Sequence, residues 1–232
     1  MQKSSPVAVI TGASRGLGAA LAQALATQGW KLVLDARNHH ALDRTAPEGS
    51  TVVPGDVTDP SHRARLAEAA ARLGGADVLF NNASTLGASP LPSLAEIPVD
   101  VLDDILFTNV VAPVALIQEL LPQLLANDGR VVNVSSDAGV EAYETWGGYG
   151  ASKAALDQVS RVLAAEQPTL RVYAVDPGDM RTQLHQDAYP GEDISDRPDP
   201  TTVVPAFLRL LTEDLASGRY RAEDLLLSAV AG

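Results

Sequence analysis

The chain has 232 residues, of which 46% are apolar and 20% charged, and its formal net charge is −12. This length and composition fit a single soluble domain with a large apolar core. So acidic a chain is a poor match for sequence-independent nucleic-acid binding, which depends on Lys and Arg neutralising phosphates. The absence of cysteine excludes disulfides, thiolate metal sites and thiol catalysis.

Two stretches of the chain bear on membrane association, and neither predicts it. The N-terminal stretch MQKSSPVAVITG has no long apolar segment before its first strand-like run, so we expect no signal peptide. The apolar stretch at 110–117 contains Pro113 and is too short to cross a bilayer. We therefore expect a cytoplasmic protein.

Short β-branched runs alternate along the chain with helical stretches rich in alanine and leucine. Strands are predicted at Val7–Thr11, Lys31–Asp35, Thr51–Pro54, Val78–Asn81, Arg130–Ser135 and Arg171–Asp176. Their nearly continuous apolar character is typical of strands buried on both faces. Helices are predicted over 16–28, 60–73, 99–126 and 148–166. This alternation predicts an α/β fold with a doubly wound parallel sheet, in one domain over residues 1–232.

One segment lacks any such period. Residues 187–200, DAYPGEDISDRPDP, are rich in Pro, Asp and Gly and predict an unusually long loop. Because the segment follows the last predicted strand, a substrate loop or lid over 183–200 is one interpretation. A solvated surface excursion is the other.

The first strand runs directly into a glycine-rich turn that opens a helix. Glycine lets the backbone approach a pyrophosphate closely, and the helix N-terminus offers free N–H groups to the anion. The alternative is an ordinary tight turn between a strand and a helix. The residues expected to hold a dinucleotide here are Gly12, Ser14, Arg15, Gly16, Leu17 and Gly18.

The spacing of this turn, TGxxxGxG from Thr11, resembles that of the short-chain dehydrogenase/reductase family in its compact single-domain form. Further motifs of the family follow in order: Asp56-Val57, NNAS at 81–84, Asn109, Val134-Ser135-Ser136, Tyr149-x-x-x-Lys153 and Pro177-Gly178. Ser84 stands where the family's NNAG has its last glycine. The resemblance runs from residue 7 to about residue 182, and the tail beyond it has no specific match.

The resemblance implies a Rossmann-like fold and an oxidoreductase that interconverts a carbonyl and an alcohol with a nicotinamide cofactor. It places Asp56 and Val57 at the adenine, and Asn82 and Ala83 near the nicotinamide ribose. It also places Pro177, Gly178 and Thr182 close to the nicotinamide, where Thr182 would bond the carboxamide or a nearby phosphate.

Carbonyl reduction needs a proton donor, and the resemblance assigns this role to Tyr149. The unperturbed pKa of tyrosine is about 10. The ammonium of Lys153, one helical turn further, and a bound nicotinamide cation are expected to lower it. Taken alone, the pair is equally typical of a solvated helix face. Gly150 and Ala151 are expected to leave room for the cofactor ribose.

Two further residues complete the predicted catalytic set. Ser136 precedes Tyr149 by thirteen residues and would orient the substrate carbonyl, with the adjacent Ser135 as the alternative. Asn109 resembles the helix asparagine that holds a water linking the lysine to solvent. A polar residue filling a helix bend is the other interpretation of Asn109.

The end of the second strand bears on the choice of cofactor. Ala36 occupies the position where NAD-preferring relatives have Asp, and Arg37 the position where NADP-preferring relatives have a basic residue. Arg15 adds a second guanidinium that can bind a phosphate. We predict NADP(H). A shift of one residue would make Asp35 the ribose-binding acid and would favour NAD(H).

The remaining features concern partners. The four histidines lack metal-ligand spacing, so no metal site is predicted. Tyr143 and Trp146 would wall an apolar substrate pocket or contact another subunit. By resemblance, the helices 99–126 and 148–166 should form a homodimer, or a homotetramer when doubled. The rival class is a non-catalytic NADP(H)-binding regulatory or scaffold protein, which the retained tyrosine and lysine disfavour.

Overall fold

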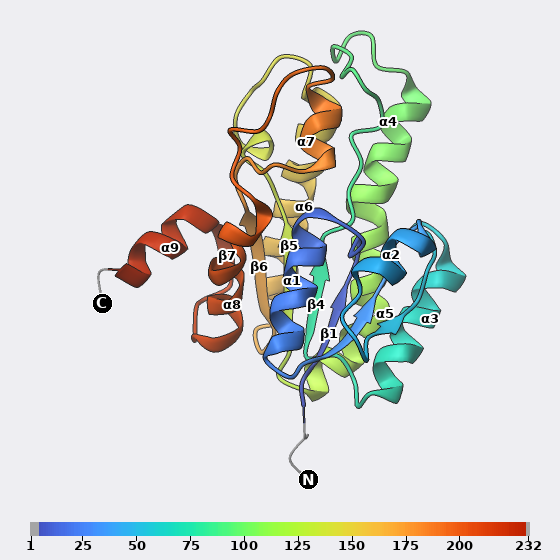
Figure 1. The fold of residues 1–232 in the computed structure, drawn as a ribbon, viewed down its shortest axis with the longest axis vertical. Coiled ribbons are helices and arrows are strands. Elements are labelled where there is room, and N and C mark those ends of the chain that lie inside the picture. The colour runs from blue at the N-terminus through green and yellow to red at the C-terminus, as the bar shows by residue number, and fades with distance from the viewer. Residues whose placement is uncertain (1–4, 231–232) are drawn as a thin grey trace.

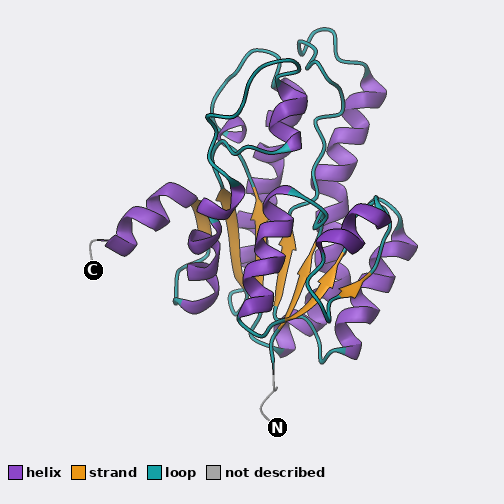
Figure 2. Cartoon of the chain, viewed as in Figure 1, coloured by secondary structure: helices purple, strands orange, loops and turns teal. Residues whose placement is uncertain are grey.

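The sheet is seven-stranded and parallel throughout, with strand order β3-β2-β1-β4-β5-β6-β7 (Figure 1; Figure 2). The computed structural model describes residues 5–230; residues 1–4, at the start of the stretch expected to lack a signal peptide, and residues 231–232 lie outside it. The strands are β1 (Val7–Ile10), β2 (Lys31–Leu34), β3 (Thr51–Val52), β4 (Val78–Asn81), β5 (Arg130–Val134), β6 (Arg171–Asp176) and β7 (Gly218–Arg221). The predicted single-domain parallel α/β fold is confirmed.

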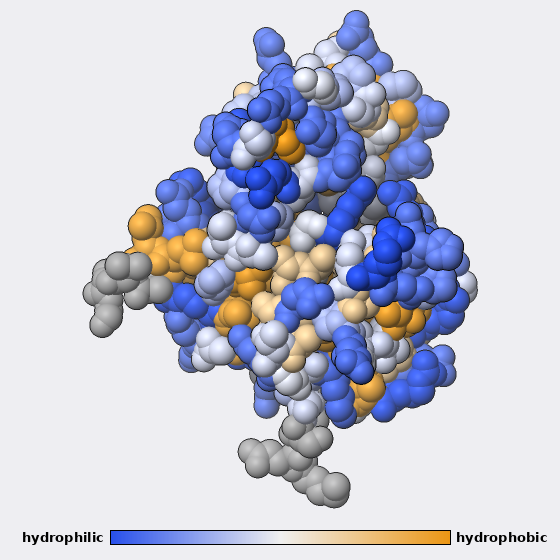
Figure 3. Space-filling model, viewed as in Figure 1, coloured by the Kyte–Doolittle hydropathy of each residue, from blue (hydrophilic) through white to orange (hydrophobic). Residues whose placement is uncertain are grey.

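Helices cover both faces of this sheet. They are α1 (Gly16–Thr27), α2 (His39–Thr45), α3 (Pro60–Arg72), α4 (Val99–Leu106), α5 (Ala112–Ala126), α6 (Gly147–Glu166), α7 (Gln183–Ala188), α8 (Val204–Thr212) and α9 (Ala222–Val230). Helices α1 and α8 pack on one face, and α3, α5 and α6 on the other. Apolar side chains gather at the surface over α9, at the left of Figure 3, where Leu227 is exposed.

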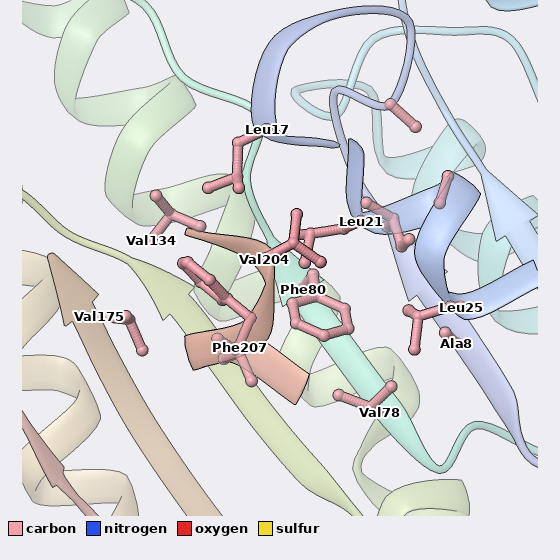
Figure 4. Close-up of a cluster of buried hydrophobic side chains, with 14 of the residues drawn as sticks. Ala8, Leu17, Leu21, Leu25, Val78, Phe80, Val134, Val175, Val204 and Phe207 are labelled. Atoms are coloured by element: carbon pink, nitrogen blue, oxygen red, sulfur yellow. The ribbon is translucent and has the colours of Figure 1, made fainter. Parts of the chain in front are cut away.

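The strands are apolar at nearly every position because both of their faces are covered. In β1, Ala8 and Ile10 join the cluster under α1 and α8, whereas Val7 and Val9 join the cluster under α3 and α5. Figure 4 shows the first cluster, in which side chains of α1 and α8 gather with Phe80 of β4. At roughly 25 cal/mol per Å² of buried apolar surface, these two clusters are the main source of stability.

The long predicted helix at 99–126 is continuous, but it changes its winding in the middle. A π-helical turn, Phe107–Val111, joins α4 to α5. Pro113 lies in the first turn of α5, directly after the π turn, and the helix continues through it. The span Val99–Ala126 is long and apolar enough to cross a membrane by length and composition alone. Leu116, Ile117 and Leu120 nevertheless pack into the sheet, as in the core helix of a folded domain.

The segment predicted as one long loop is partly helical. Helix α7 occupies its first residues, with Thr182 as the N-cap that accepts a hydrogen bond from the His185 N–H at 3.2 Å. The following irregular part is tied back to the body, because the Arg181 N–H donates to the Pro198 carbonyl at 2.8 Å. The proposed lid at 183–200 is therefore a short helix followed by an anchored return.

The order of the strands creates a crevice at the carboxyl ends of the central strands β1 and β4. The chain leaves β1 toward β2 on one side, and β4 lies against β1 on the other. At such a switch point the connecting loops diverge, and ligands of parallel α/β sheets bind beyond the carboxyl ends of the strands there.

Candidate active site

A cleft of about 580 Å³ lies along the carboxyl ends of the strands. This volume is within the range of small-molecule and cofactor sites. Its lining includes every residue predicted from the sequence to bind the cofactor except Gly18, and three of the four predicted catalytic residues, Ser136, Tyr149 and Lys153. Asn109 and Gly18 lie just behind the lining, in contact with Ser84 and Asn82 respectively.

The glycine turn after β1 needs its glycines for two separate reasons. Gly12 and Gly16 have φ of +66° and +57°, a conformation that L-residues with side chains rarely adopt. A Cβ on Gly12 would lie 2.9 Å from the Ala83 Cα, and a Cβ on Gly18 would lie 2.6 Å from the Gly12 carbonyl oxygen. The turn is therefore compact, and it leads directly into the N-terminus of α1, as an anionic pyrophosphate requires.

The loop after β4 is stitched to this turn. The Asn82 side-chain amide donates to the Thr11 and Gly12 carbonyls at 2.8 and 3.2 Å. The Thr11 hydroxyl accepts the N–H groups of Asn82 and Ala83 at 3.0 and 2.9 Å. Asn82 thus holds the two loops of the switch point together, a structural task that the sequence did not assign to it.

Asp35 is turned into the protein rather than toward the cleft. Its side chain is only 1% exposed, and its two oxygens bond the Gly12 N–H and His62 Nε2, each at 2.8 Å. Burial raises the pKa of Asp35, and its hydrogen bonds to His62 and Gly12 oppose that rise. Because Arg65 approaches the other His62 nitrogen at 3.2 Å, the His62 proton is assigned to Nε2. Both oxygens of Asp35 are committed to the glycine turn and the buried histidine.

Two arginines border the cleft near the glycine turn, and neither forms an ion pair with another described residue. Arg15, at the N-cap of α1, and Arg37, just after β2, are exposed and line the cleft. Asp56 lies across from them, and its Oδ1 accepts the Thr58 N–H and hydroxyl at 2.9 and 2.7 Å. Burial raises the pKa of Asp56, but hydrogen bonds from Thr58 and the charge of Arg37 outweigh it and lower the pKa overall.

The loop after β6 borders the cleft as well. Gly178 has φ of +73°, and its N–H donates to Asp176 Oδ1 at 3.0 Å. Thr182 lies over the glycine turn, because a Cβ on Gly16 would lie 3.3 Å from its Cγ2. Pro177, Gly178 and Thr182 therefore reach the same cleft as Gly12 and Gly16, as the sequence predicts.

Tyr149 and Lys153 lie side by side on α6 and are almost fully buried. The Lys153 Nζ is 5.3 Å from the centre of the Tyr149 ring and donates to the Val134 carbonyl at 2.8 Å. Burial lowers the pKa of Lys153 to about 8, while the charge of Asp157 opposes that fall. Burial also raises the pKa of Tyr149 well above its ordinary value, and hydrogen bonds with Ser84 and Ser136 only partly oppose this rise. The expectation that the lysine lowers the tyrosine pKa is not met by the protein residues alone, because desolvation outweighs it.

Ser136, and not Ser135, is the serine that reaches Tyr149. Ser135 is 2% exposed and its hydroxyl has no partner among the described residues, although it borders the cleft. The Ser136 hydroxyl donates to Asp137 Oδ1 at 2.9 Å and accepts the Ala138 N–H at 3.2 Å. Asp137 also accepts the Tyr143 hydroxyl at 3.0 Å. The serine hydroxyl is thus held in place beside Tyr149.

Asn109 lies in the π turn and is 1% exposed. Its amide nitrogen donates to the Thr85 carbonyl and the Ser152 hydroxyl at 2.9 and 3.0 Å. Its amide oxygen accepts the Thr85 N–H and the Ser84 hydroxyl at 2.9 and 3.1 Å. The side chain therefore ties the π turn to the loop after β4 and to α6. Ser84, the departure from the glycine of the family motif, connects this amide to Tyr149.

The small residues between Tyr149 and Lys153 are constrained by the surrounding protein. A Cβ on Gly150 would lie 2.4 Å from the Ala138 carbonyl oxygen, so glycine is needed for the loop that carries Ser136. Ala151 is exposed, and Ser152 is fully buried against Asn109. Gly150 is therefore required by the protein's own backbone, and the room for a cofactor ribose stays a prediction.

The geometry agrees with comparisons to known proteins. The family model described as "short chain dehydrogenase" matches residues 6–193. The chain belongs to the short-chain dehydrogenase family. It is an NAD(P)-dependent oxidoreductase, and the sequence-based predictions of family and enzyme class are confirmed.

Relatives of this short-chain dehydrogenase include one enzyme named for its activity and others named only as oxidoreductases. It is 37% identical over 172 residues to the rhamnolipids biosynthesis 3-oxoacyl-[acyl-carrier-protein] reductase of Pseudomonas aeruginosa, covering 69% of this chain and 66%, just under two thirds, of that protein. It is 32% identical over 223 residues to the uncharacterized oxidoreductase YciK of Escherichia coli, covering 90% of this chain and 86% of YciK. A short chain dehydrogenase from Shigella flexneri complexed with NADP is 30% identical with a TM-score of 0.87, covering 96% of this chain and 100% of that one.

The structure also adds a residue to the dehydrogenase site that the sequence did not indicate. Arg219, on the edge strand β7, donates from Nε to Asp157 at 2.9 Å. One terminal nitrogen of the same guanidinium contacts the Ser136 carbonyl at 3.0 Å and Asp176 at 3.4 Å. It thereby joins the serine loop, the end of β6 and α6. Its distance along the chain from every motif left no signal for it in the sequence.

No metal centre emerges from this arrangement. Among residues 5–230, no group of three or more His, Asp or Glu side chains is placed to hold a metal ion.

Proposed function

We propose that this dehydrogenase is an NADPH-dependent reductase that interconverts a ketone or aldehyde with the corresponding alcohol, with Tyr149 as general acid/base. The observation that carries the proposal is the meeting of Tyr149 with the Ser136 hydroxyl, beside buried Lys153, in the cleft that begins at the glycine turn. The fit of a dinucleotide rests on Gly12 and Gly16, whose positive φ and lack of side chain keep the turn open to a close backbone approach.

The residues divide the reaction among them. A bound NADPH supplies the hydride to the carbonyl carbon. Ser136 orients the carbonyl oxygen, and Tyr149 donates a proton to it as negative charge develops. Because burial raises the pKa of Tyr149, the neutral phenol predominates at neutral pH, which is the form that reduction requires. Lys153 would hold the cofactor ribose and, as a cation beside the ring, would limit the cost of the phenolate left behind.

We assign Asn109 a positioning role in this reaction. Its side chain is committed to Thr85, Ser152 and Ser84, so any water relay would use the backbone of the π turn and not the amide. The water relay from Lys153 to solvent stays a prediction. The Asn109 amide itself fixes the π turn against Ser84.

NADP(H) is the cofactor that the charges favour. Asp35 is fully engaged inside the protein and is not free to accept a ribose 2′-hydroxyl. Arg15 and Arg37 are free at the cleft edge, where a 2′-phosphate would gain two guanidinium partners. Solved relatives are described as complexes with NADP and with NADPH, which agrees with this choice.

Loss of NADPH absorbance with a panel of ketones and aldehydes tests the reaction. Wild type should oxidise NADPH with some of them. Tyr149→Phe should retain NADPH binding and lose about a hundredfold to ten-thousandfold in kcat, since general acid catalysis contributes about 10² to 10⁴. A Phe variant as active as wild type would refute the assignment of the proton donor. NADPH binding by both proteins without turnover of any compound would favour the non-catalytic alternative.

The cofactor choice is tested by kcat/KM for NADPH and NADH. Wild type should prefer NADPH, and Arg37→Gln should lose roughly tenfold of that preference, as expected for one charge-assisted contact with phosphate. Arg72→Gln, at the far end of α3, is the matched control and should leave the ratio unchanged. A wild-type preference for NADH would refute the role given to Arg15 and Arg37.

We further propose a cytoplasmic homodimer or homotetramer. Phe107 and Val111 of the π turn and Val162 of α6 are 39%, 45% and 43% exposed, on the two helical spans where a subunit contact is predicted. Light scattering after size exclusion should give a multiple of the 24.2 kDa chain. A monomer at micromolar concentration would refute this assembly.

A further inference from the structure

The part of the cleft beyond Tyr149 is walled by aromatic rings from two segments. The Trp146 ring lies 5.6 Å from the Tyr149 ring, edge to face, and 6.0 Å from the Tyr189 ring. The His185 ring lies 5.0 Å from Tyr189. Leu184 and Ala188 pack in the same cluster. Rings at these separations make a flat-sided apolar pocket, which suits a planar ring better than a flexible chain.

The charges along the cleft are segregated. The free cations Arg15 and Arg37 line its glycine-turn end, beside the first helix and β2. At the Tyr149 end the one ammonium is that of Lys153, which is 2% exposed and donates to the Val134 carbonyl. No arginine lines this end of the cleft among the described residues. A carboxylate or phosphate on the substrate would find no counter-ion there.

Three acids line the same end, and they are not equivalent. Asp176 is paired with Arg219, and Asp179 lies 3.7 Å from both Arg197 and His185. Among the residues that the structure describes, Asp137 has only neutral hydrogen-bond donors: the hydroxyls of Ser136 and Tyr143 and the Ala138 N–H. An uncompensated carboxylate therefore lies next to the serine that must orient the substrate carbonyl.

We propose that the substrate is an uncharged or cationic carbonyl compound with a planar ring next to the reacting carbon, and that Asp137 is a specificity-determining residue that excludes anionic substrates. This inference rests on the proposed carbonyl reduction. An anionic substrate that places its carbonyl oxygen on Ser136 would bring its charge close to the Asp137 carboxylate in a partly desolvated site, where like charges repel most strongly. A cation there would gain from the carboxylate and from the surrounding ring faces.

The test uses three meta-substituted benzaldehydes with the same core, because a meta group lies closer than a para group to the carbonyl bound at Ser136: tolualdehyde, carboxybenzaldehyde and trimethylammoniobenzaldehyde. With NADPH, wild type should show kcat/KM for the carboxylate at least about thirtyfold below that for tolualdehyde, a difference typical of an unpaired charge near a like one. The cationic aldehyde should be turned over at least as well as tolualdehyde. An unbranched aliphatic aldehyde of equal carbon number should be at least about tenfold worse than tolualdehyde.

Variants assign the effect to residues and cancel the intrinsic reactivity of each aldehyde. Asp137→Asn should raise the carboxylate-to-tolualdehyde ratio at least about tenfold, whatever happens to the absolute rates. Glu141→Gln removes an exposed acid four residues further along the same crossover and should leave the ratio unchanged. Tyr189→Leu should reduce the advantage of tolualdehyde over the aliphatic aldehyde.

A binding measurement separates this inference from the proposed function. The corresponding benzyl alcohols are titrated into the NADPH-bound protein, and quenching of cofactor fluorescence is followed. Weaker binding of the carboxylate without turnover of any aldehyde would remove the proposed reaction and keep the substrate class. Turnover or binding of the anionic compound within about threefold of tolualdehyde would overturn the substrate class, and an unchanged ratio in Asp137→Asn would overturn the role of Asp137.

Discussion

Arg219 gives the sharpest test of how the C-terminal part of the chain supports the site. Its guanidinium donates to the carboxylate of Asp157, which is 1% exposed, and to the Ser136 carbonyl. Arg219→Met keeps the length of the side chain and removes the charge. Breaking a buried ion pair from one side costs about 3 to 5 kcal/mol, because the remaining charge is left without a partner. Since Arg219 is 22% exposed and water can reach the gap, we expect about 2 to 4 kcal/mol.

The assay combines urea denaturation with steady-state kinetics. Arg219→Met should lower the free energy of unfolding by this amount and reduce kcat, because the loop of Ser136 loses a donor. The double variant Arg219→Met/Asp157→Leu removes both charges, and a cavity of about 120 Å³ beside Asp157 gives the leucine room. It should recover part of the stability, because Asp176 is still left without its contact to Arg219, but it should not recover kcat, since the Ser136 carbonyl still lacks its donor.

Arg221→Met is the matched control on the same strand. Arg221 is 58% exposed and pairs only with exposed Glu223, so its loss should cost less than about 0.5 kcal/mol. If Arg219→Met costs no more than this control, the clasp does not stabilise the fold. If the double variant regains full activity with its stability, Arg219 does not position Ser136.

Three further changes follow from the same geometry. The pKa of Lys153 is about 8 in the folded protein and 10.5 ordinarily, so the unfolded chain binds more protons between these two pH values. The wild-type free energy of unfolding should therefore rise with pH over this range by up to about 3 kcal/mol relative to Lys153→Met. Parallel pH profiles of the two proteins in urea titrations would contradict this. Gly150→Ala should cost about 1 to 3 kcal/mol and lower kcat, because its Cβ would lie 2.4 Å from the Ala138 carbonyl, whereas Ala151→Ser should be neutral in both assays. Ser84→Ala removes a hydrogen bond that lowers the pKa of Tyr149, so the pH profile of alcohol oxidation, which needs the phenolate, should move up by about 0.5 to 1 unit, and an unmoved profile would remove Ser84 from the site.

The core strands could be predicted because burial on both faces leaves an apolar signal at nearly every residue. The bounds of Val78–Asn81 and Arg171–Asp176 are as predicted, and the other four predicted strands end one or two residues early. The edge strand Gly218–Arg221 was missed because its sequence, GRYR, is half exposed and carries two arginines, so neither an apolar run nor a clean alternation appears. The short helix α2 and the tail helices α8 and α9 were missed with it.

The site residues that could be predicted are those whose chemistry is fixed by a local motif. Those that could not are defined by contacts across long separations. Asp35 illustrates the difference, because its place at the end of a strand left two roles open. Its contact with His62, 27 residues further, decides between them by committing the second carboxylate oxygen inside the protein. Ser84 departs from the glycine of the family motif, and only its contact with Asn109, 25 residues further along the chain, gives its hydroxyl a role.

The acidic composition of the chain argues against polyanionic partners, yet the cleft must receive an anionic cofactor. The arrangement of charges removes the conflict. The Debye length is about 8 Å at physiological ionic strength, so the distant acids of a −12 surface are largely screened, whereas Arg15 and Arg37 act on a phosphate in contact with them. Asp137 acts in the same short range at the other end of the cleft. The two ends thus select opposite charges independently. Added salt should therefore raise the KM for NADPH more than that for NADH, while the discrimination between neutral and anionic aldehydes, set inside a partly desolvated pocket, should change less.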